Sequence, residues 1–280
     1  MRHYTERIVF VAFDLETTGL QPVMHRAIEL SAVKFTSSGR VLGEFDELIN
    51  PGIPIPEASS RVHGISEEDL RNKPHAPSIL EGFKEFLKEP GCEVILLAHN
   101  SEFDVSFLGS EYILSSIDFP DNEIWDTLPM ARALVPRIMN HKLTTLVHHF
   151  DIRADGAHRA LVDSYYVCQV FQKFCTMVEQ LEELKELGSP RTFDLARRLF
   201  AVQLPLPMIK LKKSISENRK LKFVYEGETG IRETIEAQPL NLFKDDRYSY
   251  LSALRSNMGY PESFRLDRLS KPELMDMELS

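Results

Sequence analysis

The stretch Arg7-Ile-Val-Phe-Val-Ala-Phe-Asp-Leu-Glu16 decides the fold of this chain. Its run of six apolar residues predicts a buried strand that ends in two acids. Because side chains alternate across a strand, Asp14 and Glu16 share one face, above Phe10 and Ala12. Neighbouring carboxylates repel each other unless a cation lies between them, and oxygen ligands suit Mg²⁺ or Mn²⁺. The strand therefore indicates a metal site, although a solvated strand end explains this short pattern as well.

The segments after this strand predict an α/β fold. Residues 27–35 and 40–49 are expected to form two more strands around the turn Thr36-Ser-Ser-Gly39, which makes the start of the sheet antiparallel. Further strands are expected at 93–98 and 124–126, and helices at 78–88, 142–150 and 159–187. Strands that give way to alternating helix and strand imply a mixed sheet flanked by helices.

A small β-rich domain is expected after the stiff connector Gln203-Leu-Pro-Leu-Pro207. The predicted elements there are a helix at 208–219 and strands at 221–225, 231–237, 248–254 and 263–269. We therefore expect a first domain of residues 1–180, a helical linker of residues 181–205 and a second domain of residues 206–280.

Composition and charge exclude several classes of protein. Of the 280 residues, 43% are hydrophobic and 27% charged, which excludes wholesale disorder. No apolar run approaches the ~18 residues of a membrane span, and residues 1–7 lack the apolar stretch of a secretory signal. Three cysteines form no disulfide framework, so we expect a cytoplasmic protein. The net charge of −9 argues against a basic nucleic-acid coat, with −10 in residues 1–180 and +1 in residues 206–280.

Two more acids follow in chain order, each near a histidine. Asp104, in His99-Asn-Ser-Glu-Phe-Asp104, comes directly after a predicted strand, where ligands gather in α/β sheets. Asp163, in His158-Arg-Ala-Leu-Val-Asp163, lies near the start of a predicted helix. Five residues turn a helix by about 140°, so His158 must precede the helix to reach a site that Asp163 lines. Taken singly, a first-turn acid and a surface histidine are ordinary features.

Together these residues resemble the DnaQ-like proofreading exonucleases, in the DEDDh branch named after four acids and a histidine. The three motifs are Phe13-Asp-Leu-Glu-Thr-Thr-Gly-Leu20, Ala98-His-Asn-Ser-Glu-Phe-Asp-Val-Ser-Phe-Leu108 and Ala157-His-Arg-Ala-Leu-Val-Asp163. Supporting similarities are Ala27-Ile-Glu-Leu30, His63-Gly-Ile65, Trp125-Asp-Thr127 and His141-Lys-Leu143. The resemblance covers residues 7–178. It implies a ribonuclease H-like fold and a 3′→5′ exonuclease that releases nucleoside monophosphates during DNA replication or repair.

The resemblance also implies a role for each site residue. Two divalent ions, Mg²⁺ or Mn²⁺, would be held by Asp14, Glu16, Asp104 and Asp163, with His158 as general base. The substrate would be single-stranded nucleic acid or a frayed 3′ end, and both DNA and RNA are open. Positions that resemble contacts to the terminal nucleotide are Thr17, Thr18, Leu20, Asn100 and Phe103, although core packing is the simpler role for Phe103.

The C-terminal part resembles a WYL domain, a small Sm-like β fold of bacterial regulators. The resemblance rests on Phe223-Val-Tyr225, Pro239-Leu240, Ser249-Tyr-Leu251 and Phe264-Arg-Leu-Asp-Arg-Leu269, and Ser249 stands where the family has its tryptophan. Candidate nucleic-acid contacts are Tyr248, Tyr250, Arg255, Arg265 and Arg268. Tyrosines in a core and arginines on a solvated face explain the same residues equally well.

Other functions compete with this hypothesis. One is a non-catalytic nucleic-acid-binding or regulatory protein, against which the four intact acids count. Another is a transcriptional regulator, against which the lack of a recognisable helix-turn-helix counts. A sliding-clamp partner is suggested faintly by Gln203-Leu-Pro-Leu-Pro207, but Pro207 stands where an aromatic residue belongs, and a plain linker is the simpler interpretation.

Overall fold

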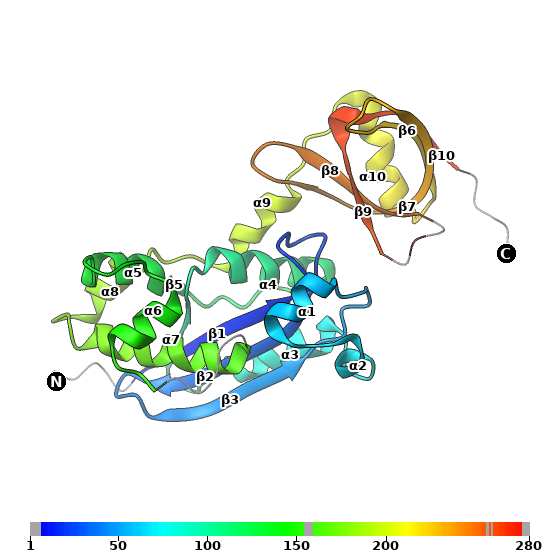
Figure 1. Cartoon of the computed structure of the whole chain (residues 1–280). Coiled ribbons are helices and arrows are strands. Elements are labelled where there is room, and N and C mark those ends of the chain that lie inside the picture. Colours follow the sequence, from blue (N-terminus) through cyan, green and yellow to red (C-terminus); the bar gives the residue numbers. More distant parts are fainter. Residues whose placement is uncertain (1–6, 154–158, 256–257, 259, 276–280) are drawn as a thin grey trace. The chain divides into compact units, whose positions relative to one another are not determined.

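The computed structural model describes residues 7–153, 159–255, 258 and 260–275. The chain divides into two compact units, Met1–Leu195 and Ala196–Ser280, and each has its own sheet (Figure 1). Each unit also has its own apolar core. Among the helices of these described ranges, none is both long and apolar enough to span a bilayer.

A five-stranded mixed sheet with the order β3-β2-β1-β4-β5 forms the centre of the first unit (Figure 1). Antiparallel pairs join β1 to β2 and β2 to β3, whereas β4 runs parallel to both β1 and β5. The strands are β1 (Ile8–Thr17), β2 (Ala27–Thr36), β3 (Val41–Leu48), β4 (Glu93–Ala98) and β5 (Ile124–Asp126). The predicted mixed sheet is confirmed, and the carboxyl ends of its three parallel strands meet at one edge.

Helices cover both faces of this sheet. One core includes α3 and α4, and the other includes α5, α6, α7 and α8. The helices of the first unit are α1 (Glu57–His63), α2 (Glu67–Leu70), α3 (Ala76–Phe86), α4 (Glu102–Leu114), α5 (Thr127–Leu134), α6 (Leu143–His149), α7 (Ala160–Cys175) and α8 (Leu181–Leu187). A 3₁₀ turn, Phe193–Ala196, follows at the border between the units.

Strand β1 contributes to both cores because its side chains alternate. Val11 and Phe13 are fully buried on the side of α3 and α4, and Phe10 and Ala12 are fully buried on the side of α7. The register of β1 therefore decides which helix faces the acids at its end. Asp14 and Glu16 continue the row of Phe10 and Ala12, so they point toward α7.

The prediction of one long helix over residues 159–187 is wrong, because the segment forms two helices. Helix α7 ends at Cys175, and α8 begins after a capping box in which Gln180 and Glu183 each bind the other's backbone N–H. The carboxylate of Glu183 also accepts the N–H of Glu179 at 3.0 Å, which favours a new start over a continuous helix. Leu181 and Leu184 are buried in the core that includes α5, α6 and α7, so this part of the expected linker packs with the first unit.

The second unit contains one antiparallel sheet with the order β10-β6-β7-β8-β9. Its elements are α9 (Arg197–Phe200), a 3₁₀ turn (Leu206–Met208), α10 (Ile209–Ser216), β6 (Leu221–Glu226), β7 (Arg232–Lys244), β8 (Ser249–Arg255), β9 (Glu262–Arg265) and β10 (Leu269–Leu274). Strand β7 is longer than predicted, because a register shift after Pro239 lets the strand continue past a residue without an N–H. The strand predicted at 263–269 is interrupted by the 3₁₀ turn Leu266–Arg268, which separates β9 from β10.

Candidate active site

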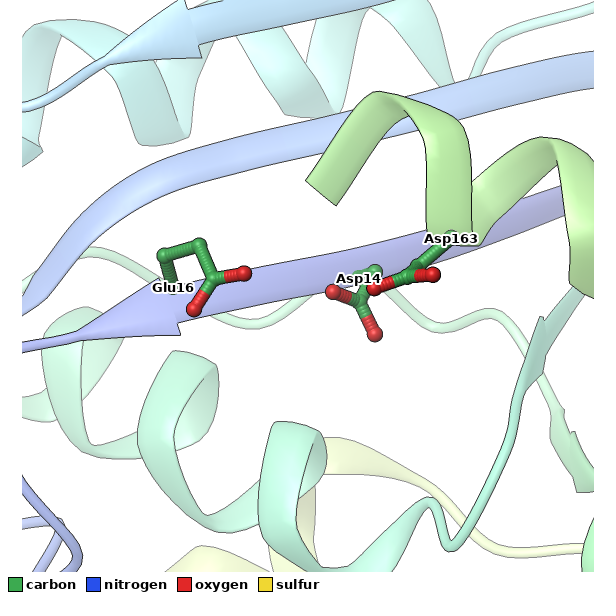
Figure 2. A group of neighbouring side chains, drawn as sticks. All are labelled: Asp14, Glu16 and Asp163. Atoms are coloured by element: carbon green, nitrogen blue, oxygen red, sulfur yellow. The ribbon is translucent and has the colours of Figure 1, made fainter. Parts of the chain in front are cut away.

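Three carboxylates meet where β1 ends. Asp14 and Glu16 extend from the same face of β1, and Asp163 extends from the first turn of α7 toward them (Figure 2). The three residues are partly buried, and each offers an oxygen that lies within 4.8 Å of the oxygens of the other two. Like charges at this separation repel each other strongly unless protons or a cation offset them. The structure thus brings together three of the four acids predicted from the sequence.

The fourth predicted acid, Asp104, lies beside this group rather than in it. It occupies the first turn of α4, is only 4% exposed, and accepts a hydrogen bond from the backbone N–H of Leu15. This hydrogen bond joins α4 to β1 at Leu15, the residue between Asp14 and Glu16 in the sequence. The charge of Asp104 also raises the pKa of Asp14, so the two carboxylates interact.

Burial and mutual repulsion make the ionised forms of these acids unfavourable. The pKa of Asp14 is raised well above its usual range, mainly by burial and then by Asp104 and Asp163. Burial, Glu29 and Asp163 raise the pKa of Glu16 to about 7, and burial raises that of Asp104 to about 8. A divalent cation would offset both causes, and a donor set made only of oxygens fits Mg²⁺ or Mn²⁺. The residues present therefore fit the metal that the sequence implies.

The loop between β1 and β2 carries three of the predicted substrate contacts. Leu20 is 85% exposed there, which leaves its side chain free to contact a ligand. Thr17 and Thr18 are buried, and their hydroxyls take part in the loop itself: that of Thr17 donates to Gly19 O at 2.7 Å, and that of Thr18 accepts the N–H of Arg26 at 3.0 Å. A role for either threonine in substrate binding remains a prediction.

The other two predicted contacts lie at the start of α4. Asn100 is exposed and has a positive φ of 65°, and its N–H donates to Asp126 at 3.0 Å. Phe103 is partly buried, and its ring centroid lies 4.7 Å from that of Phe107 within the core. Phe103 thus packs in the core, as the simpler interpretation of the sequence predicted, and its contact with substrate remains a prediction. His158, the predicted base, lies outside the described residues.

Asp126 organises this edge of the sheet, although the sequence analysis gave it no role. It is 5% exposed and accepts the N–H groups of Asn100 and Ser101, both at 3.0 Å, and of Leu128 at 2.8 Å. One carboxylate thus caps α5 and holds the turn that leads into α4. The available signal was an acid at the end of a predicted strand, in Trp125-Asp-Thr127.

The five residues proposed for the second unit separate into two groups. The guanidinium of Arg265 lies 3.4 Å from the ring centroid of Tyr248, whose ring is 6.4 Å from that of Tyr250. All three arginines also lie next to acids: Arg265 pairs with Asp267 at 2.6 Å, Arg255 with Glu233 and Glu262 at 2.9 and 2.5 Å, and Arg268 lies 3.9 Å from Glu228. The structure therefore gathers Tyr248, Tyr250 and Arg265, and among the described residues it shows no contact of Arg255 or Arg268 with these rings.

Both units match known protein families. A ribonuclease H-like mixed sheet with acids gathered at one edge of the sheet defines the first unit as a nuclease. Residues 11–171 match the family model described as Exonuclease (RNase_T), so the chain belongs to this family of DnaQ-like exonucleases. Residues 208–274 match the WYL domain, which confirms both resemblances found in the sequence.

The chain is similar to a small part of much longer DNA polymerases. It is 35% identical to the DNA polymerase III PolC-type of Pediococcus pentosaceus over 167 residues. The match covers 59% of this chain and 11% of that relative. The chain thus spans about a tenth of the length of the relative that it matches.

Two solved nuclease structures share the fold. Exonuclease X in complex with 5′ overhanging duplex DNA has a TM-score of 0.51 at 21% identity, and the match covers 65% of this chain and 99% of that chain. E. coli exonuclease I in complex with a dA16 oligonucleotide has a TM-score of 0.57 at 18% identity, covering 89% of this chain and 55% of that one. At these identities the likeness establishes the architecture.

Proposed function

We propose that this protein is a metal-dependent 3′→5′ exonuclease that releases nucleoside monophosphates from the 3′ ends of nucleic acids. The observation that carries the proposal is the group of Asp14, Glu16 and Asp163, whose oxygens lie within 4.8 Å of one another. Concentrating three acids at a partly buried position costs free energy, and only a bound cation makes the arrangement favourable while they stay ionised. The exonuclease family to which the chain belongs fits such a site.

Each residue of the site has a proposed role. Asp14, Glu16, Asp104 and Asp163 hold two divalent ions, Mg²⁺ or Mn²⁺. Bound there, the ions supply positive charge to the scissile phosphate and acidify water. His158 accepts a proton from the attacking water as general base. Attack at phosphorus breaks the bond to the 3′ oxygen of the preceding nucleotide and frees the terminal monophosphate.

The proposed substrate is a single-stranded or frayed 3′ end. Leu20 offers an exposed apolar side chain to a terminal base, and Asn100 is exposed at the end of β4, next to the strand that carries the acids. Thr17, Thr18 and Phe103 border the same region through their loop and helix. Two solved structures with this fold contain an overhanging duplex and a dA16 oligonucleotide, which supports DNA as the substrate.

The WYL domain has the proposed role of binding the single strand beyond the cleavage site. Tyr248 is 38% exposed, and its ring and the guanidinium of Arg265 form one stack on the second unit. Aromatic rings stack on unpaired bases whatever their sequence, and guanidiniums bind phosphates. The gathering of Tyr248, Tyr250 and Arg265 supports this role, and Arg255 and Arg268 stay predicted phosphate contacts that, like Arg265, pair with acids in the structure.

Degradation of end-labelled substrates tests the proposal. Single-stranded DNA, overhanging duplex DNA and RNA, each labelled at the 5′ end, are incubated with the full chain and Mg²⁺, Mn²⁺ or EDTA. We expect a ladder that shortens from the 3′ end, mononucleotides as the product, and no cleavage in EDTA. A folded protein that shortens none of them with either metal would overturn the proposal and favour a non-catalytic nucleic-acid-binding protein.

A further inference from the structure

An ion pair between a buried carboxylate and a half-exposed arginine fastens the start of helix α7 to strand β2, beside the acidic group. Glu29 is 1% exposed, and its Oε1 accepts bonds from Nε and Nη2 of Arg159 at 3.0 and 2.6 Å. Its Oε2 accepts the backbone N–H of Ala160, the first residue of α7, at 3.0 Å. One carboxylate therefore holds both the side chain before the helix and the first N–H group of the helix.

A second tether lies one helical turn further along. The hydroxyl of Ser164 donates to the carbonyl oxygen of Ser31 at 3.1 Å, and both residues are fully buried. Glu29 and Ser31 are two residues apart on β2, about 6.8 Å along a strand, and Ala160 and Ser164 are about 6 Å apart along a helix. Because these spacings nearly match, the first turn of α7 lies along β2 with both of its ends bonded.

Asp163 lies between these two tethers. Its backbone N–H donates to the carbonyl oxygen of Arg159 at 3.1 Å, so the residue that pairs with Glu29 also forms a hydrogen bond with Asp163. The direction of the Asp163 carboxylate depends on where α7 begins and how the first turn is rotated. The bonds of Glu29 determine both.

Fold stability alone does not explain an acid at position 29. The charge of Glu29 raises the pKa of both Asp14 and Glu16, so it works against the acids that it borders. Apolar residues of similar volume often replace a buried ion pair without loss of stability. A carboxylate with four directional bonds differs from an apolar contact in allowing essentially one geometry, which is the property that a metal ligand needs.

We infer that Glu29 and Arg159 form a positioning pair, the α7 latch, that holds the carboxylate of Asp163 in place for divalent metal binding. The inference rests on the proposed metal-dependent function and adds two residues to it. When either partner is lost, the first turn of α7 can rotate or fray. Metal affinity and turnover then fall together, while binding of the nucleic acid through the β1–β2 loop and the WYL domain is retained.

The chain contains a matched control for the latch. Nε and Nη2 of Arg26 donate to the carboxylate of Glu111 at 2.8 and 2.5 Å, and Glu111 also accepts the N–H of Ala27 at 3.0 Å. Glu111 is 1% exposed, like Glu29, but it lies near the end of α4 instead of at the start of α7. Glu111→Gln therefore removes an ion pair whose carboxylate is equally buried, without touching the helix of Asp163.

The test measures Mn²⁺ binding by titration calorimetry on the full chain, together with kcat and KM on single-stranded DNA. We expect Glu29→Gln and Arg159→Ala to weaken Mn²⁺ binding about 10–100-fold, the usual effect of losing a residue that orients a metal ligand. We expect kcat to fall with it and KM to stay within about twofold. Arg159→Lys, which keeps the charge, should recover part of the loss, and Glu111→Gln should change Mn²⁺ affinity less than about threefold.

Hydrogen exchange at residues 160–164 gives a readout that is independent of metal. Both latch variants should exchange faster there than the wild type, and Glu111→Gln should not. If Glu29→Gln fails to fold, Arg159→Ala decides, because the Arg159 side chain is 52% exposed and tolerates truncation. Unchanged Mn²⁺ affinity in the folded latch variants, or an equal loss in Glu111→Gln, would overturn the latch.

Failure of the proposed function has a different signature. If the wild-type protein binds Mn²⁺ but degrades no nucleic acid, the proposed nuclease function is wrong, and calorimetry on the variants still tests the latch. A wild-type protein that binds no Mn²⁺ overturns both.

Discussion

Glu16 of β1 and Glu29 of β2 are register partners across an antiparallel pair of strands. Like charges directly opposite each other destabilise a sheet, and Glu29 is buried as well. Arg159 offsets part of this cost, since it binds Glu29 and also lowers the pKa of Glu16. The remaining repulsion destabilises the ionised forms of Asp14 and Glu16 at the end of β1. Because a bound cation would offset this repulsion, we expect metal binding to stabilise the sheet.

Without metal, the free energy of unfolding should fall as the pH rises from 6.5 to 8.5. The folded chain keeps a proton on Glu16 up to a pKa of about 7 and on Asp104 up to a pKa of about 8, whereas unfolded acids lose theirs near pH 4. The folded state therefore binds more protons in this window, and its stability is lost with rising pH, on the order of 1–2 kcal/mol. Urea unfolding in EDTA at several pH values measures the slope.

The lower limit of that window reduces an opposite effect of histidines. Burial lowers the pKa of His25, His63 and His99, so these groups add most of their stability as the pH rises toward 6.5, and only about 0.4 kcal/mol each above it. Asp104→Asn should flatten the slope above pH 6.5, and Mn²⁺ at pH 8 should restore the stability that EDTA removes. A free energy that rises with pH between 6.5 and 8.5 contradicts the repulsion inferred from the structure.

Asp14→Asn should lower the nuclease activity and raise the stability of the metal-free protein. The amide keeps the shape of the side chain and removes the charge that faces Glu16, Asp104 and Asp163. We expect cleavage to fall at least about 10³-fold, because a metal ligand is lost, and Tm in EDTA to rise by roughly 2–4 °C for each kcal/mol of repulsion removed. Asp163→Ala should be equally inactive. Full activity of either variant with metal present would rule out the proposed ligand set.

Calcium should bind the site and support little turnover. Ca²⁺ accepts the same carboxylate oxygens as Mg²⁺, but its coordination is longer and looser, which orients water and phosphate poorly. In competition assays, Ca²⁺ should therefore inhibit the Mn²⁺-dependent reaction, and it should raise Tm in the absence of substrate. Turnover with Ca²⁺ at the rate seen with Mn²⁺ would show that the acids do not orient the reaction through their metals.

His158→Ala should lower turnover by about 10²–10⁴-fold, the usual contribution of a general base, with little change in Mn²⁺ affinity. The expectation rests on its place in the sequence, next to Arg159 of the latch and five residues before Asp163. Single-turnover cleavage and Mn²⁺ titration, measured on the same preparation, separate the two effects. A parallel collapse of metal affinity would instead make His158 a ligand or a structural residue.

Features that depend on neighbouring residues were predictable from the sequence. The alternation in β1 places Asp14 and Glu16 on one face, and β4 begins and ends at the predicted residues, Glu93 and Ala98. Such features follow from the chain's own period and do not depend on distant partners. That Asp163 lies close to the β1 acids could be predicted only from the order of the three motifs, because no local pattern indicates that α7 packs against β1.

Features that depend on distant partners were not predictable. Glu29 stands in the apolar strand sequence Ala-Ile-Glu-Leu, and its partner Arg159 follows 130 residues later. Nothing local distinguishes it from an acid on a solvated strand. The acidic partners of the C-terminal arginines were equally hidden from the sequence: Arg255 pairs with Glu233 and Glu262 on neighbouring strands. The break between α7 and α8 depends on a capping box that competes with continuous helical periodicity.

The stack on the WYL domain leads to a prediction about affinity for single strands. Arg265 lies over the ring of Tyr248, and Tyr248 is 38% exposed, so a base can extend the stack without a change in the fold. Stacking on an aromatic ring contributes about 1–3 kcal/mol per base, and neutralised phosphates make binding depend on salt. Tyr260 is also exposed, at 48%, and does not belong to the stack, which makes it a matched control.

Tyr248→Ala should therefore weaken binding of single-stranded DNA at least about fivefold, the equivalent of the lower limit of one stacked base. The measurement uses the inactive Asp14→Asn protein as background and fluorescence anisotropy at two salt concentrations. Arg265→Ala should weaken binding because it removes the guanidinium that stacks on Tyr248, with little change in the salt dependence, since Asp267 already binds its charge at 2.6 Å. Tyr260→Ala should leave affinity unchanged, and Arg255→Ala should lower the stability of the second unit, because it removes the ion pairs with Glu233 and Glu262. If Tyr248→Ala and Tyr260→Ala bind DNA equally well, the WYL domain does not contact the strand through this stack.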